Sequence, residues 1–153
     1  LGMTKQRKFF SSWGENEADA LGLETTLGLM VMIKEIAFTA YPVKNVQATR
    51  EWYEQHLGLK FSGPYAEDGV EKYNEANVGS GYFALMTHEW IEREPGSGSG
   101  VAFEVDNVEE MSGKLRLAGI TVGDVYETPV CKIASFNDPE GNKVTLHQVT
   151  VPH

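Results

Sequence analysis

An internal repeat is the sequence feature that most constrains how this chain can fold. The segment Val43-Lys44-Asn45-Val46 returns as Val105-Asp106-Asn107-Val108, and Leu57-Gly58-Leu59 returns as Ala118-Gly119-Ile120. An apolar segment with strand character precedes each copy, and another follows it. Two copies are too few for a solenoid, in which each repeat must be covered by neighbours. The repeat therefore predicts one domain built from a duplicated module.

Each module begins with the local pattern strand, cap, helix, glycine. Ile36–Tyr41 is rich in β-branched and aromatic residues, which favours a strand, and Pro42 is expected to limit further pairing. Asn45 can cap the next helix, since its side-chain oxygen can accept a backbone N–H of the first turn. Apolar residues then recur with helical spacing as far as Leu57, and Gly58 favours a helix end. In module two, Asn107 is the corresponding cap.

The rest of the chain is predicted to complete both modules. Residues 1–31 lie outside the repeat as an extension, with a short helix around Glu15–Leu21 as one alternative. Residues 32–150 form the single domain, which consists of module one at 32–91, a linker at 92–100 and module two at 100–150. The end of the linker, Pro95–Gly100, is flexible by composition. Asp138–Asn142 is a turn. Further strands are expected at 59–61, 70–78, 82–87, 101–105, 121–126, 130–136 and 143–149.

Charge and cysteine content exclude several classes of partner. The chain of 153 residues has a formal net charge of −9, which disfavours nucleic acid and anionic membrane surfaces. No apolar run is long enough to span a bilayer. The single cysteine, Cys131, cannot form an internal disulfide and is expected to be an ordinary thiol. We therefore expect a cytoplasmic protein.

The duplicated module, the two Val-x-Asn-Val helix starts and the Asp138–Asn142 turn before a last apolar strand resemble the vicinal oxygen chelate superfamily. That superfamily includes glyoxalase I, extradiol dioxygenases, fosfomycin-resistance enzymes and bleomycin-binding proteins. The resemblance implies an α+β fold in which two βαβββ modules form a curved, partly open, eight-stranded mixed sheet. It also implies a ligand in the concave face (the cup) and, as in many relatives, a homodimer.

The resemblance implies four metal-ligand positions, one on each of four strands. They map to Phe38, Leu85, Gly100 and Thr145. Phenylalanine, leucine and glycine side chains cannot coordinate a divalent ion, and threonine is a poor ligand. We therefore expect no cofactor. A displaced divalent-metal site that includes His88 and Glu89 together with Glu104 and His147 stays open as an alternative.

Alternation of side chains along strands predicts which residues line the cup. The predicted ligand-binding residues are Phe38, Phe83, Leu85, Thr87, Ala102 and Thr145. The alternative is that these side chains simply fill the interior of the fold.

Glu104 and His147 are the predicted catalytic residues. If Glu104 is desolvated between Phe103 and Val105, its pKa would be raised, as a general base requires. The alternative is a wet rim, or an ion pair with Lys143. His147 could act as acid, base or ligand, or could be a hydrogen-bonded rim residue.

Three functions remain after the sequence analysis. The preferred one is metal-independent binding of a small, partly apolar molecule in the cup. The second is a lyase, isomerase or dioxygenase with a non-standard site around Glu104 and His147. The third is a protein-interaction module, which predicts a filled cup and a large exposed apolar patch.

Overall fold

The computed structural model describes residue 33 and residues 35–151. The chain divides into two compact units, residues 1–35 and residues 36–153. All helices and strands reported below belong to the second unit. The predicted extension at residues 1–31, with its alternative short helix around Glu15–Leu21, lies outside the described residues.

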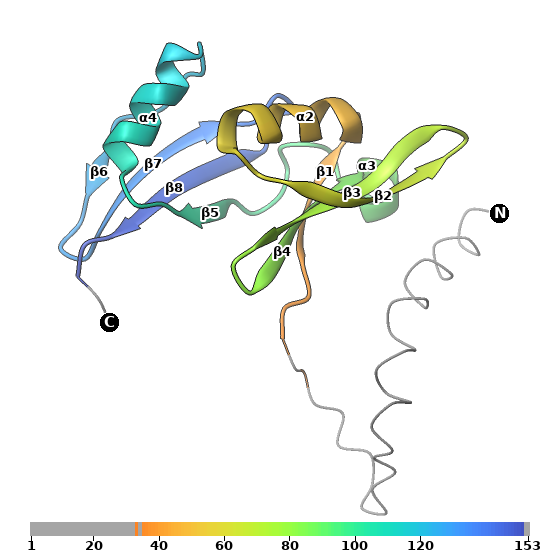
Figure 1. Cartoon of the computed structure of the whole chain (residues 1–153), viewed down its shortest axis with the longest axis horizontal. Helices are drawn as coiled ribbons and strands as arrows, with labels where there is room; N and C mark the ends of the chain where they lie inside the picture. Colours follow the sequence, from red (N-terminus) through yellow and green to blue (C-terminus); the bar gives the residue numbers. More distant parts are fainter. Residues whose placement is uncertain (1–32, 34, 152–153) are drawn as a thin grey trace, which may run out of the picture. The chain divides into compact units, whose positions relative to one another are not determined.

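Module one forms a four-stranded mixed sheet with one long helix (Figure 1). Its elements are β1 (Thr39–Val43), α2 (Val46–Leu57), β2 (Phe61–Glu67), β3 (Val70–Val78) and β4 (Gly81–Thr87), followed by the short helix α3 (His88–Ile91). The strand order is β1-β4-β3-β2, and β1 is parallel to β4.

Module two repeats this arrangement. Its elements are β5 (Val101–Glu104), α4 (Val108–Leu117), β6 (Tyr126–Glu127), β7 (Cys131–Asn137) and β8 (Lys143–Val149). The strand order is β5-β8-β7-β6, and β5 is parallel to β8, as β1 is to β4. The predicted α+β fold of two repeated modules is confirmed, and its eight strands divide into two four-stranded sheets.

Both predicted helix caps are present. The Asn45 side-chain oxygen accepts a 2.9 Å hydrogen bond from the Ala48 amide, and the Asn107 oxygen accepts one of 2.9 Å from the Glu110 amide. Gly58 ends α2 with a φ of 66°, in the left-handed region that glycine tolerates best. These bonds span three residues, so local sequence was sufficient to predict them.

Three strand predictions need correction. β1 begins at Thr39 rather than Ile36. It continues through Pro42 because β1 is an edge strand, where the backbone N–H that proline lacks is not needed for pairing. The strand expected at 59–61 is instead β2, which runs from Phe61 to Glu67 and passes Gly63 and Pro64 by register shifts. The strand expected at 121–126 shortens to β6, and the Gly123 amide instead donates to the Ser135 carbonyl at 2.9 Å.

The helices cover one face of each sheet, and the core lies beneath them. Helix α2 packs on β3 and β4, whereas α4 packs on β7 and β8 (Figure 1). Tyr53 of α2 lies against Phe83 of β4, with ring centroids 5.1 Å apart. Phe83 also meets Phe103 of β5 edge-on at 5.3 Å, so one hydrophobic core continues from module one into module two.

The turn at Asp138–Asn142 joins the two modules. The Glu140 carboxylate accepts hydrogen bonds from the Lys44 and Asn45 amides, immediately before α2. The Asn142 side chain donates to the Pro42 carbonyl at 3.1 Å. The sequence predicted this segment only as a chain reversal. In the structure its side chains also bind backbone groups of module one that are about 100 residues away.

The glycine-rich linker is attached to the same turn. The Gly96 amide donates to the Asn142 side-chain oxygen at 2.9 Å, and Gly96 has a φ of 80°. Beside it, the Tyr41 hydroxyl donates to the Lys143 carbonyl and accepts from the Val101 amide, so it connects β1 with both β8 and β5. Composition indicated a flexible segment, whereas tertiary hydrogen bonds anchor it at Gly96.

Candidate functional site

The face of each sheet opposite its helix, here called the open face, is the place where the predicted site residues were expected. In module one the structure corrects part of that expectation. Phe83 and Leu85 are 2% and 0% exposed and belong to the core beneath α2. Thr87, two residues further along β4, is also buried. Strand alternation therefore places Ala84 and Met86, rather than these three residues, on the open face.

Phe38 and the middle of β3 build the open face of module one. The Phe38 ring meets the Tyr73 ring edge-on, with centroids 6.0 Å apart. Tyr73 is paired with Met86 and Glu75 with Ala84, so these four residues share a face. The result is an apolar and aromatic face with a carboxylate within it, on which Phe38 is partly exposed whereas the other four residues are buried.

Tyr73 and Glu75 form a buried polar pair on this surface. The Tyr73 hydroxyl donates to the Glu75 carboxylate, and the residues are 3% and 6% exposed. Burial, together with the hydrogen bond to Glu75, raises the pKa of Tyr73, so the phenol stays protonated and keeps donating. The Glu75 carboxylate is thus a fixed polar group on an otherwise apolar face.

In module two, the structure brings four predicted residues together on the open face. Ala102 is paired with Thr145, and Glu104 with His147, whereas the alternating residues Val144 and Leu146 are buried beneath α4. The Thr145 and Ser135 hydroxyls lie 2.8 Å apart and share a hydrogen bond. The shared face follows from strand alternation; the binding and catalytic roles of these residues stay predictions.

Glu104 and His147 form a hydrogen-bonded pair. One Glu104 oxygen bonds His147 Nδ1, and the other accepts from the Val149 amide at 2.7 Å. The Glu104 and His147 side chains are 55% and 33% exposed. The partner of Glu104 is thus His147, not Lys143 as one alternative supposed.

The hydrogen bonds change the expected chemistry of Glu104. The bond from His147, and then that from the Val149 amide, hold the pKa of Glu104 below its ordinary value. The condition for a raised pKa, desolvation of Glu104, is not met: Glu104 lies at a wet edge of the sheet, as the wet-rim alternative supposed. A carboxylate on Nδ1 orients the imidazole and leaves Nε2 as the ring nitrogen that can accept a proton. Within the described residues, Nε2 of His147 has no hydrogen-bond partner.

The described residues contain no group of three or more His, Cys, Asp and Glu side chains that could hold a metal ion. His88 lies 3.8 Å from Glu94, in an ion pair that forms only when His88 is protonated. The Cys131 thiol lies 3.1 Å from the Thr128 hydroxyl. Neither residue is joined to Glu104 and His147 by an interaction seen here.

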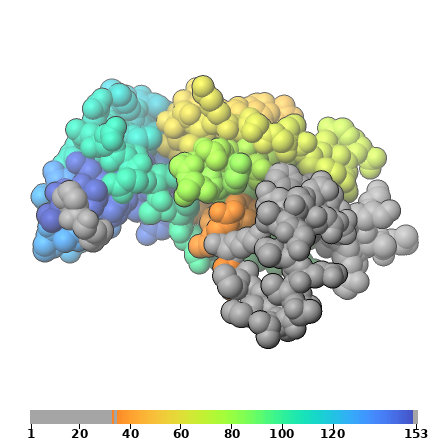
Figure 2. Space-filling view, turned by 60° about the horizontal axis from the view of Figure 1, so that its bottom comes forward, coloured from red at the N-terminus to blue at the C-terminus, as the bar shows by residue number. Residues whose placement is uncertain are grey.

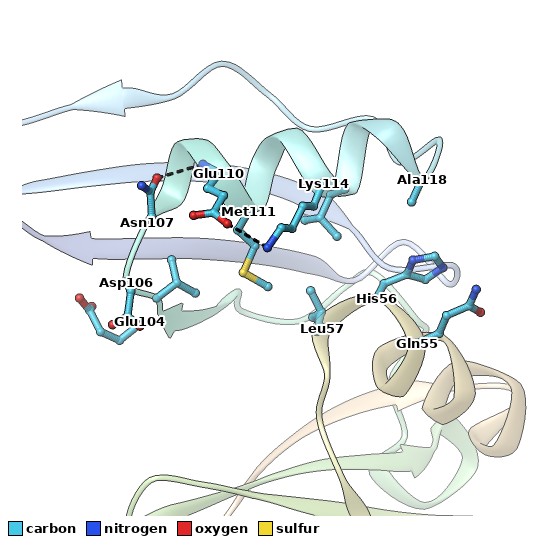
Figure 3. Close-up of a pocket in the computed structure, with 12 residues that line it drawn as sticks. Gln55, His56, Leu57, Glu104, Asp106, Asn107, Glu110, Met111, Lys114 and Ala118 are labelled. Carbon is cyan, nitrogen blue, oxygen red and sulfur yellow. Dashed lines mark hydrogen bonds and ion pairs between the residues drawn. The ribbon is translucent and has the colours of Figure 1, made fainter.

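A separate cavity of about 660 Å³ lies between the C-terminal end of α2 and helix α4 (Figure 3). Leu57 and Met111 point toward one another across it, and Glu104, Asp106 and Glu110 lie at one end. No pattern in the sequence predicts this cavity. No local signal could have revealed it, because the gap depends on how the two modules pack against one another.

The comparisons with known proteins agree with the fold. Residues 35–146 match the family model described as the Glyoxalase/Bleomycin resistance protein/Dioxygenase superfamily. The chain belongs to this superfamily. Searching the curated proteins gave no match. Within the described part of the chain, no helix is long and apolar enough to cross a membrane.

Several solved structures are similar to this chain. TnmS3, an antibiotic binding protein from Streptomyces sp. CB03234, has a TM-score of 0.67 and 23% identity over 77% of this chain and 98% of its own. A superfamily member from Sphaerobacter thermophilus DSM 20745 has a TM-score of 0.67 and 21% identity over 77% of this chain and 99% of its own. A lactoylglutathione lyase from Agrobacterium tumefaciens has a TM-score of 0.61 and 18% identity over 76% of this chain and 94% of its own. At these identities the likeness establishes the fold.

Proposed function

We propose that the open faces of the two sheets bind a small, partly apolar molecule without a metal ion. The observation that carries the proposal is the side-chain chemistry at the four positions where the family resemblance implies metal ligands. Phe38 and Gly100 offer no side-chain donor atom, and the Thr145 hydroxyl is already bonded to Ser135. Leu85 lies in the core, and its neighbour Ala84, which is on the open face of β4, offers no donor atom either.

The surface around these positions supports the same proposal. Phe38 supplies a partly exposed aromatic ring, which packs on the buried Tyr73, and the buried Glu75 carboxylate supplies one fixed polar group on the same face. Small-molecule sites in proteins combine an apolar lining with a few placed polar groups. TnmS3, which is similar in fold, is described as antibiotic binding, so the fold is compatible with this use.

Two measurements on the full chain test the proposal. Elemental analysis of protein purified without chelators should find no stoichiometric divalent ion. Titration with the fluorescent apolar probe 8-anilinonaphthalene-1-sulfonate should give saturable binding that EDTA does not change.

Phe38→Ala should weaken this binding several-fold, because it removes a ring from the open face. Leu117→Ala, which removes an apolar side chain that is 91% exposed at the end of α4, away from the open faces, is the matched control. One bound metal ion per chain, or equal binding by both variants, would contradict the proposal.

Acid–base catalysis is the second candidate function, and the Glu104–His147 pair favours it. His147 Nε2 would accept a proton from a carbon acid, while Glu104 holds the imidazole in place through Nδ1. A lyase or isomerase reaction uses such a proton transfer; a dioxygenase reaction would in addition need a bound metal.

Lactoylglutathione is a suitable first compound to test, because a protein described as a lactoylglutathione lyase shares this fold. If the protein turns it over, His147→Ala should abolish the activity. Glu104→Gln should lower it less, since the neutral amide can still contact Nδ1. Unchanged turnover in both variants would rule out the pair as the catalytic group.

A homodimer and a cytoplasmic location stay predictions. The mass of one chain is 16.9 kDa, so light scattering coupled to size exclusion distinguishes a monomer from a dimer directly.

A further inference from the structure

We infer that the cavity between α2 and α4 is a second binding site, and that it takes a small organic cation with an aromatic or apolar body. This inference goes beyond the proposal for the open faces, because the cavity lies between the two helices and shares only Glu104 with the open-face residues named above (Figure 3). Its volume of about 660 Å³ is within the range of small-molecule sites, roughly 300–1,000 Å³.

The floor of the cavity is apolar. Leu57 ends α2, and Met111 and Leu115 lie one turn apart on the facing side of α4. Leu115 is 2% exposed and belongs to the hydrophobic core, against which Leu57 and Met111 also pack. The floor is therefore continuous with the core and is held in place by it. A flexible, polarisable methionine beside leucine suits an aromatic ring in particular.

The rim is acidic at one end. Glu104, Asp106 and Glu110 bring three carboxylates to that end, and Lys114 brings one ammonium group (Figure 3). Glu104 is already hydrogen-bonded to His147 and to the Val149 amide, so the acidic character of the rim rests on Asp106 and Glu110. Lys114 pairs with Glu110 at 2.9 Å, and both side chains are more than 60% exposed, so the pair neutralises only part of the charge. Asp106 is exposed and has no hydrogen bond or ion pair within the described residues.

The helix end beside this rim does not attract an anion. The first amides of α4 already have acceptors, because Val108 donates to the Gln148 side chain at 3.0 Å and Glu110 donates to Asn107 at 2.9 Å. Glu109 and Glu110 add negative charge to the first turn. The formal net charge of −9 favours the approach of cations from solution. An apolar floor with an acidic end therefore selects a cation with an apolar body.

The test uses thioflavin T, a planar aromatic cation, titrated into the full-length protein by fluorescence. Asp106→Asn should raise its Kd about five-fold, the size expected for one carboxylate near the surface. Lys114→Gln should lower the Kd by a similar factor, because it leaves Glu110 uncompensated. Asp124→Asn makes the same chemical change at an exposed residue outside the cavity and should leave the Kd unchanged. Higher salt should weaken binding to the wild type more than to Asp106→Asn.

The outcomes separate this inference from the proposal for the open faces. Phe38→Ala should not change thioflavin T binding, and Asp106→Asn should not weaken binding of the anionic 8-anilinonaphthalene-1-sulfonate. Met111→Lys places an ammonium group on the floor and should abolish thioflavin T binding, with circular dichroism as the check that this variant folds. Equal Kd values for Asp106→Asn and Asp124→Asn would overturn the inference. So would thioflavin T binding that depends on Phe38.

Discussion

Tyr53 of α2 donates a 2.9 Å hydrogen bond to the carboxylate of Asp138, in the turn between β7 and β8. The two residues are 0% and 4% exposed. Burial raises the pKa of Tyr53, and the charge of Asp138 raises it further, so the phenol donates throughout the physiological pH range. This bond ties the helix of module one to the turn of module two, the same turn in which Asn142 accepts the hydrogen bond from Gly96.

Tyr53→Phe should therefore destabilise the protein while preserving the shape of the core. The substitution removes one donor from a buried carboxylate, which costs about 2 kcal/mol when the other partner stays buried. Urea unfolding measures the effect. Tyr126→Phe removes a hydroxyl from a residue that is 65% exposed and should change the free energy of unfolding by less than about 0.5 kcal/mol. Equal stabilities of the two variants would show that the bond contributes nothing.

The pH dependence of stability should carry the signature of Asp138. Burial raises its pKa above the ordinary value, although hydrogen bonds from Asn142, Tyr53 and the Glu140 amide act in the opposite direction. The folded state therefore holds the Asp138 proton more tightly than the unfolded state. This contribution to stability is complete below the ordinary pKa of the group and is lost as the pH rises through the raised pKa of the folded state.

Asp138→Asn provides the comparison, because it cannot titrate. The stability deficit of this variant relative to wild type should grow as the pH falls from neutral toward 4, the ordinary range of an aspartate. Chemical denaturation at a series of pH values measures the difference. A deficit that shrinks on acidification would mean that the carboxylate titrates below its ordinary pKa in the folded protein.

Gly96→Ala should destabilise the joint between the modules. Gly96 has a φ of 80°, and an added Cβ would lie 3.0 Å from the Gly141 carbonyl oxygen. The left-handed conformation alone costs about 1–2 kcal/mol for an alanine. Gly98→Ala, in the same linker, meets nothing within 4 Å and has no such φ, so it should be neutral or slightly stabilising. Thermal unfolding of the two variants gives the answer; a fully flexible linker would tolerate both.

Loss of His147 should raise the pKa of Glu104. The hydrogen bond from His147 is the main cause of the lowered pKa, and the Val149 amide is the next. In His147→Ala, carbon-detected NMR titration of Glu104 should show a pKa closer to, but still below, the ordinary value. His88→Ala should leave the pKa of Glu104 unchanged.

A lowered pKa contributes stability that is present above the pKa of the unfolded state and is lost as the pH falls through the folded value. Because Glu104 is exposed, added salt should reduce the shift.

The sequence by itself determined the modules and their local structure. The repeat predicted two equivalent halves, and Asn45 and Asn107 cap their helices through bonds that span three residues. The strands at Val70–Val78 and Lys143–Val149 also have the predicted bounds. These features depend on neighbours in sequence, so propensity and spacing are sufficient to find them.

Only the tertiary structure decided which face of a strand is covered and what the turns touch. Alternation grouped Phe83 with Leu85 correctly but could not tell that α2 covers that face. Asp138, Asn142 and Gly96 look like turn residues in the sequence, and their partners lie 46 to 100 residues away. The cavity between α2 and α4 likewise exists only once both helices are packed. Such contacts depend on how distant segments meet, and no window of local sequence encodes that.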